Sequence, residues 1–240
     1  MWPKITENYS PNFCITKRSK IKVKFIIIHY TGMKNELSAL RRLCTENSKV
    51  SAHYFIKKNG SILKLVPDLY IAWHAGISRW KNKKNLNEYS IGIEIQNSGH
   101  EYLNEKFLSK QIISLKKLLK FLMKKYRINH KNVLGHSDIA PARKKDPGEK
   151  FPWKNLAKNK LALWHTLNER KIKKKRLQHL KPVDYKKFTK NLGKIGYKRS
   201  SKKENKIFIV KAFQRRFRSE LINGISDQEC FLISQNLLKR

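Results

Sequence analysis

Two histidines and one aspartate have the residue types and positions that a catalytic metal site requires. His29 ends the apolar run 25–28, and His136 ends a second short apolar segment, 132–135. Asp146 follows ten residues after His136, in a proline-bounded loop that can fold back beside it. Two histidines and one carboxylate, with a fourth position open, are a ligand set of catalytic zinc. The chemistry that this set suggests is metal-assisted hydrolysis.

Glu94 lies in the apolar stretch 91–95, between Ile93 and Ile95. Burial of a carboxylate costs several kcal/mol unless the group is paired or its pKa is raised. Strand alternation places Gly92, Glu94 and Gln96 on one face of the strand. One interpretation is that this face is exposed to solvent. The alternative is a general base beside a metal-activated water. Spacing alone leaves both interpretations open.

Lys144 lies two residues before Asp146, within the basic run Arg143-Lys144-Lys145. One interpretation is a solvated surface charge. The other is a cation that stabilises the oxyanion of a hydrolytic reaction, a role that preorganised positive groups fulfil. Because Lys144 is close in sequence to the expected ligand Asp146, the second role is geometrically possible. Spacing alone does not decide between the two interpretations.

Composition places the chain among folded globular proteins. Hydrophobic residues make up 40%, with only 10 Gly and 7 Pro, which excludes disordered and fibrous classes. No segment approaches the roughly 18 apolar residues of a membrane span. Residues 1–24 are polar and basic, so no signal-peptide core is expected. Three cysteines without C-x-x-C spacing predict no disulfide framework, which favours a reducing, cytoplasmic compartment.

The net charge of +38 arises from 55 Lys and Arg against 17 Asp and Glu. An excess of this size normally indicates a polyanionic partner. Here it is spread evenly, with 33 basic and 11 acidic residues in 1–165 and 22 and 6 in 166–240. Because a nucleic-acid site would concentrate the charge in a stripe, no specific nucleic-acid partner is expected.

The elements that must position these residues alternate between strands and helices. Apolar runs predict buried strands, and i, i+3, i+4 periodicity predicts helices. Residues 75–89 lack periodicity and are expected to form a long surface loop. The pattern predicts strands at 23–30, 90–97 and 132–135, a hairpin at 51–57 and 62–66 with an Asn-Gly turn, and helices at 35–46, 109–126 and 151–167. This order predicts an α/β domain with a mixed central sheet flanked by helices.

The basic run 170–176, followed by Lys181-Pro182, marks the expected end of that domain. Beyond it, three short amphipathic segments broken by glycines predict a small three-helix module. The expected organisation is an N-terminal extension at 1–20, a catalytic domain at 21–168, a basic linker at 169–182 and a helical module at 183–240.

Five motifs carry a family resemblance. In order along the chain they are FIIIHYTG, VSAHYFI, AWHAGIS, SIGIEIQN and GHSDIAPARKKDPGEKFPW. At these distances they resemble the zinc-dependent N-acetylmuramoyl-L-alanine amidases of the amidase-2 family, which shares its fold with peptidoglycan recognition proteins. The resemblance covers about residues 21–165. The segment IVKAFQRRFR with Asn223-Gly224 makes the C-terminal module similar to peptidoglycan-binding domains, which implies affinity for glycan strands.

Carried over residue by residue, the resemblance implies one zinc ion per chain held by His29, His136 and Asp146. Glu94 matches the catalytic glutamate and Lys144 the catalytic lysine. Four further residues correspond to a segment bordering the substrate groove: Trp73, His74, Arg79 and Trp80.

The function that the resemblance implies is hydrolysis of the bond between N-acetylmuramic acid, or its anhydro form, and L-alanine. The substrate would be peptidoglycan or muropeptides in cell-wall turnover or recycling. A non-catalytic peptidoglycan-binding protein is the first rival, and it predicts an incomplete ligand set. A basic nucleic-acid-binding protein is the second, and it predicts steeply salt-dependent binding.

Overall fold

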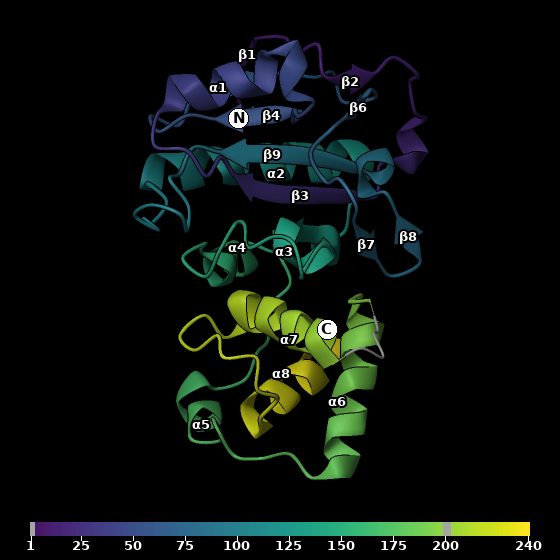
Figure 1. Cartoon of the computed structure of the whole chain (residues 1–240), viewed down its shortest axis with the longest axis vertical. Helices are drawn as coiled ribbons and strands as arrows, with labels where there is room; N and C mark the ends of the chain where they lie inside the picture. Colours follow the sequence, from purple (N-terminus) through teal and green to yellow (C-terminus); the bar gives the residue numbers. More distant parts are fainter. Residues whose placement is uncertain (1–2, 199–202) are drawn as a thin grey trace.

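A six-stranded mixed sheet organises the first two thirds of the protein, as the computed structural model shows (Figure 1). The structure describes residues 3–198 and 203–240. The strand order is β1-β5-β4-β9-β3-β10, and the four strands from β4 to β10 run parallel. The strands of this sheet are β1 (Ile5–Glu7), β3 (Phe25–Tyr30), β4 (Tyr54–Ile56), β5 (Ile62–Lys64), β9 (Ser90–Ile95) and β10 (Val133–Gly135). The predicted mixed α/β architecture is confirmed.

One face of the sheet packs against the long helix α2 (Ser109–Tyr126), whose bounds match the prediction. Isoleucines of β3 and β9 meet the leucines of this helix in one buried cluster. Strands covered on both faces consist of nearly continuous apolar residues, which explains the runs in β3 and β9. Helix α1 (Glu36–Cys44) begins at the capping side chain of Asn35 and buries Ala39 and Leu43 against Phe55.

Short elements complete the sheet-containing part of the chain. The predicted hairpin is confirmed: β4 pairs with β5 in antiparallel register, and Gly60 has the φ of +89° that its turn requires. The remaining short elements are β2 (Phe13–Cys14) with β6 (Ile71–Ala72), the helix α3 (His136–Ile139), and 3-10 helices at Lys20–Lys22, Glu46–Ser48, Leu86–Tyr89 and His130–Asn132.

Two predicted segments differ from the structure. Within the predicted loop 75–89, β7 (Arg79–Trp80) and β8 (Lys83–Lys84) form a small hairpin, and Trp80 is buried. Strands of two residues are too short to show any periodicity. The predicted helix 151–167 is limited to α4 (Trp153–Lys158), because Lys160 takes a left-handed φ of 56° and Leu161 then turns into the core.

The predicted three-helix module is present, formed by α6 (Pro182–Ile195), α7 (Lys203–Phe217) and α8 (Gln228–Leu238), below the sheet in Figure 1. The segment expected to be a linker contains α5 (Glu169–Lys173), and the segment expected to be an extension contributes β1. The domain boundaries themselves stay a prediction. Within the described ranges, none of the helices combines the length and apolarity that crossing a bilayer requires.

The helical module shares a hydrophobic core with the sheet. Phe25 and Ile27 of β3 and Leu134 of β10 belong to the same buried cluster as Phe188 and Phe213 of the module. Strand alternation directs Phe25 and Ile27 away from α2, so the module lies on the second side of the sheet. The two parts of the chain therefore stabilise each other.

Substitution of Phe213 by alanine should destabilise the whole chain. The ring is fully buried in the shared core, and a Phe→Ala change in a core costs about 3–5 kcal/mol. All five tryptophans precede residue 165, so fluorescence reports unfolding of the sheet-containing part together with the loss of the contacts that Trp80 and Trp164 make with the module. In urea, F213A should shift that fluorescence transition to lower denaturant. F208A, on the same helix but 39% exposed, is the control, and an unshifted F213A transition would contradict the shared core.

Candidate metal centre and active site

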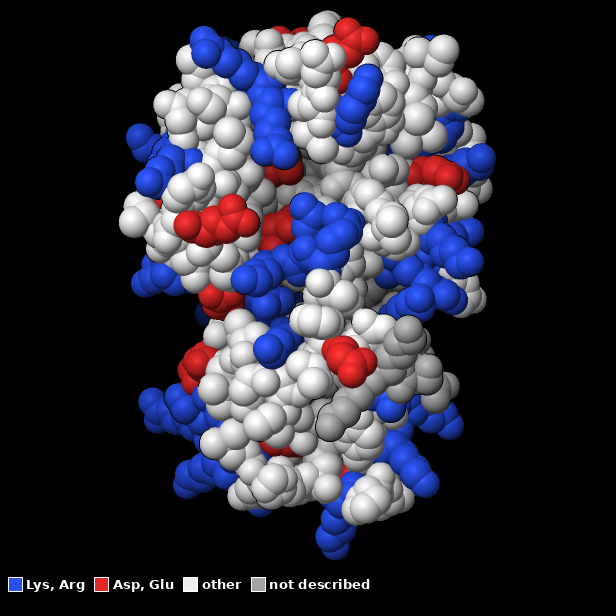
Figure 2. All heavy atoms as spheres, in the orientation of Figure 1, with Lys and Arg blue, Asp and Glu red and all other residues white. Residues whose placement is uncertain are grey.

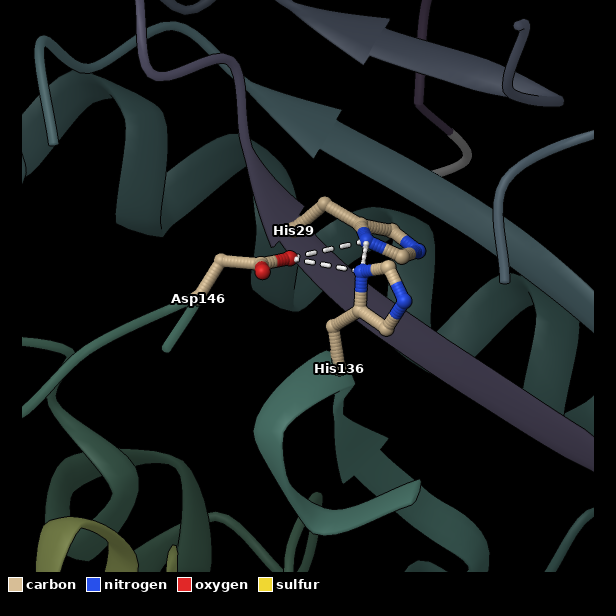
Figure 3. Close-up of side chains that lie close together, drawn as sticks. All are labelled: His29, His136 and Asp146. Atoms are coloured by element: carbon tan, nitrogen blue, oxygen red, sulfur yellow. Dashed lines mark hydrogen bonds and ion pairs between the residues drawn. The ribbon is translucent and has the colours of Figure 1, made fainter. Parts of the chain in front are cut away.

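The candidate metal site lies at the carboxyl ends of the central parallel strands, where open α/β sheets bind ligands. His29 is the penultimate residue of β3, and His136 begins α3 directly after β10. Asp146 reaches the same point from the loop after α3. Figure 3 shows the three side chains converging, each from a different segment.

The three donor atoms are within contact distance of one another. His29 Nδ1 lies 2.9 Å from His136 Nδ1 and 2.9 Å from Asp146 Oδ2. His136 Nδ1 lies 3.1 Å from the same carboxylate oxygen. All three residues are buried, and their ligand atoms fall within 4.8 Å of each other. The predicted ligand set is thus brought together.

A directed chain of hydrogen bonds assigns the proton on His29. The Ser90 hydroxyl donates to the carbonyl of Leu86, so its oxygen accepts from His74 Nε2 at 3.3 Å. His74 Nδ1 then accepts from His29 Nε2 at 3.1 Å. His29 Nδ1 is left with a free electron pair directed at the site. The chain requires Gly92, because a Cβ there would lie 2.4 Å from His74 Cγ.

His136 is oriented in the same manner. Its Nε2 donates to the carbonyl of Ala75 at 3.1 Å, which leaves its Nδ1 as an acceptor. Two imidazole electron pairs and one carboxylate oxygen therefore face each other in a buried place. These acceptors repel one another unless a cation lies between them, and the His₂Asp set suits zinc. The residues present thus fit a metal ion.

The protonation states agree with this assignment. Burial, then the charge of His136, lowers the pKa of His29 to about 4, so its ring is neutral. Burial alone would raise the pKa of Asp146, but the charges and hydrogen bonds of His136 and His29 outweigh it and hold that pKa well below its usual range. The site thus combines the neutral imidazole of His29 with an ionised carboxylate, as metal binding requires.

Glu94 lies beside His29 because β3 and β9 pair these two residues in register. Its side chain lines the cleft, and its Oε2 is buried without a hydrogen-bond partner among the described residues. Burial, then the charge of Asp146, raises the pKa of Glu94 to about 8, although Lys144 and Arg42 partly offset this. A carboxyl with such a pKa can take and return a proton near neutral pH.

The cleft around these groups has a volume of about 400 Å³ and a cationic rim. Lys144, which is half-buried, lines it together with Arg42, Arg143 and Lys145. Figure 2 shows blue side chains on both sides of a central hollow and scattered over the rest of this face. The cleft therefore suits a substrate with carboxylate groups.

The four residues expected to border the groove divide into two pairs. Trp73 and His74 line the cleft. Arg79 lies outside it, in a hollow shared with α6, and Trp80 is buried against Tyr197 with ring centroids 4.9 Å apart. The structure places Trp80 in the core rather than at the cleft.

Sequence reasoning missed the residues that support the site. Arg42 reaches the cleft from α1, far from every motif. His100, which the sequence analysis did not single out, accepts from the Tyr30 hydroxyl at 2.8 Å and lies 2.8 Å from Glu149. The sequence carries no signal for contacts across 49 and 70 residues.

Substitution of His74 by alanine should weaken zinc binding about 10–100-fold, the usual effect of losing a group that orients a metal ligand. The hydrogen bond that holds the proton on His29 Nε2 would be gone. Competition against a chromophoric chelator measures the affinity, with H130A, a histidine remote from the site, as the control. Unchanged affinity in H74A would contradict the assigned chain.

In the zinc-free protein, the contribution of Glu94 to stability should fall as the pH rises from about 5 to about 8. The folded-state pKa of Glu94, about 8, exceeds its ordinary value of 4.5, so the folded chain keeps a proton that the unfolded chain releases in this range. E94Q does not titrate, and its stability advantage over wild type should therefore grow across the range. Urea unfolding of chelator-treated protein tests this; a constant difference would refute the raised pKa.

Comparisons with known proteins identify the family of this chain. Residues 19–149 match the family N-acetylmuramoyl-L-alanine amidase. The Escherichia coli amidase AmiD is 35% identical over 233 residues, which cover 91% of this chain and 83% of that protein. The 1,6-anhydro-N-acetylmuramyl-L-alanine amidase AmpD of Haemophilus influenzae is 40% identical over 106 residues, 44% of this chain and 55% of that protein.

Two solved structures have the same architecture. AmiD in complex with anhydro-N-acetylmuramic acid-L-Ala-D-gamma-Glu-L-Lys superposes with a TM-score of 0.80 at 34% identity, covering 94% of this chain and 92% of that one. AmpDh3 of Pseudomonas aeruginosa in complex with anhydromuramic pentapeptide gives 0.80 at 30% identity, covering 95% and 96%. The expected resemblance is confirmed: this chain belongs to the N-acetylmuramoyl-L-alanine amidase family.

Proposed function

We propose that this protein hydrolyses the amide bond between the lactyl group of N-acetylmuramic acid, or its anhydro form, and L-alanine of the stem peptide. The reaction serves the turnover or recycling of peptidoglycan and muropeptides. One zinc ion is held by His29, His136 and Asp146. The observation that carries the proposal is the buried convergence of these three donors in a cleft of about 400 Å³.

When bound, zinc supplies the Lewis acidity that polarises the scissile carbonyl and makes water nucleophilic at neutral pH. Glu94 accepts the proton that the attacking water loses and delivers it to the amino group of the departing L-alanine. Its position next to His29 in the sheet and its pKa of about 8 suit both transfers.

Lys144 stabilises the negative charge that develops on the carbonyl oxygen. The ammonium group lines the same cleft, close enough to Glu94 and His29 to affect the pKa values of both. A preorganised cation at a developing oxyanion is typically worth a factor of about 10²–10³ in rate. Arg42, which also lines the cleft, can bind a carboxylate of the peptide.

Two observations favour an enzyme over a binding protein. A recognition protein without metal predicts an incomplete ligand set, whereas all three ligands are present and oriented here. It also gives no reason for the Glu94 carboxyl oxygen that is buried beside them without a hydrogen-bond partner in the described part of the chain, which a general base explains.

Mass spectrometry of anhydro-muropeptides incubated with the zinc-loaded protein tests the proposal. Wild type should release stem peptide that begins at L-alanine. E94A should abolish release yet retain zinc, since Glu94 is not a ligand, and K144M should slow release about 10²–10³-fold. K150M, which removes an exposed charge nearby but outside the cleft, is the matched control. Zinc-loaded wild type that releases no peptide would refute the proposed activity.

A further inference from the structure

We propose that Arg215 and Arg216 of α7, in the C-terminal module, are positioning residues of the metal site. They belong to the segment IVKAFQRRFR, which the resemblance linked only to peptidoglycan binding. Both are buried, at 8% and 3% exposure, in a module otherwise rich in exposed lysines. The inference rests on the proposed zinc site and assigns the module a role besides binding glycan.

Arg216 clamps the junction between β10 and α3. One end of its guanidinium, Nη1, pairs with the carboxylate of Asp138. The other end, Nη2, donates to the carbonyl of Val133 at 3.0 Å. Because His136 lies between these two contacts in the chain, one side chain holds the strand before the ligand and the helix that carries it. A planar two-pronged donor is suited to bridging two acceptors.

Asp138 transmits this contact to the ligand. Its Oδ2 accepts from the backbone N–H of Gly135 at 2.8 Å, and its Oδ1 accepts from the Tyr197 hydroxyl at 2.7 Å. Both oxygens are thus used to fix the start of α3. This helix has only four residues, too few to keep a fixed orientation without tertiary contacts. The direction of His136 therefore depends on partners from the C-terminal module.

Packing makes the clamp rigid. The guanidinium of Arg216 lies 4.3 Å from the ring of Trp153 and 5.0 Å from that of Phe217. Asp138 and Arg216 are both almost fully buried. Removal of one member of a buried ion pair leaves the other charge without compensation. The orientation of α3 is therefore sensitive to a substitution of Arg216.

Arg215 extends the support to the other two ligands. Its Nε lies 3.8 Å from Glu149, which follows three residues after Asp146. Glu149 also contacts His100, and His100 contacts the hydroxyl of Tyr30, which directly follows His29. The two adjacent arginines therefore reach the segments that carry all three metal ligands.

The test compares R216M with R218M in the full-length protein. Arg218 is also buried and pairs with Asp227 and Glu229, but both partners lie within the module. R216M loses one buried ion pair and R218M loses two, so both should have a lower Tm. Only R216M should weaken zinc affinity, by about 10–100-fold in chelator competition. R216K keeps the positive charge but lacks the planar guanidinium that bridges two acceptors, so it should recover only part of the zinc affinity.

Arg215→Gln provides a milder variant should R216M fail to fold, and it should weaken zinc binding in the same direction. Unchanged zinc affinity in both R216M and R215Q, or an equal loss in R218M, would overturn the inference. These results leave the proposed function standing because wild type still binds zinc. A wild type that binds no zinc would instead overturn the proposed function, and this inference with it.

Discussion

The mutual repulsion of three electron-pair donors is the constraint on which this structure depends. Two imidazole nitrogens and a carboxylate oxygen face each other within 4.8 Å in a buried place. Without a cation this arrangement is unfavourable, so it persists only if the surrounding structure enforces it. The hydrogen bonds to His74 and Ala75, which direct both ring protons away from the site, are the local part of that enforcement.

The rest of the fold supplies the remaining part. One face of β3 and β9 is covered by α2, which anchors the strand that carries His29. On the other face, the side chains near the start of β3 pack against the helical module. The side chains near the carboxyl end of β3 form the site. The module thus contributes to the same core that orients the ligands. Stability and metal binding are therefore coupled through this side of the sheet.

Much of the site could be predicted from residue types at strand ends. His29, His136 and Asp146 were identified because each follows an apolar run or lies in a loop beside one. Glu94 could not be assigned from spacing, because strand alternation is identical whether that face meets solvent or a cleft; its pairing with His29 places it at the cleft.

The remaining differences have a common cause. Trp80 was expected beside substrate, but it packs on Tyr197, a contact across more than one hundred residues that no local pattern encodes. The helix predicted to reach residue 167 ends at Lys158, since apolar residues at helical spacing also fit an irregular segment that turns into the core. Local periodicity identified the long elements, whereas contacts between residues distant in sequence decided these details.

X-ray absorption spectroscopy of the zinc-loaded protein would test the central claim most directly. The account predicts two imidazole nitrogens at about 2.0–2.1 Å and oxygen donors at about 2.0–2.2 Å around a four-coordinate ion. H136A should lose one imidazole contribution, and C230A should leave the spectrum unchanged. A sulfur donor at about 2.3 Å, or a spectrum unaffected by H136A, would contradict the assignment of His29, His136 and Asp146 as the ligands.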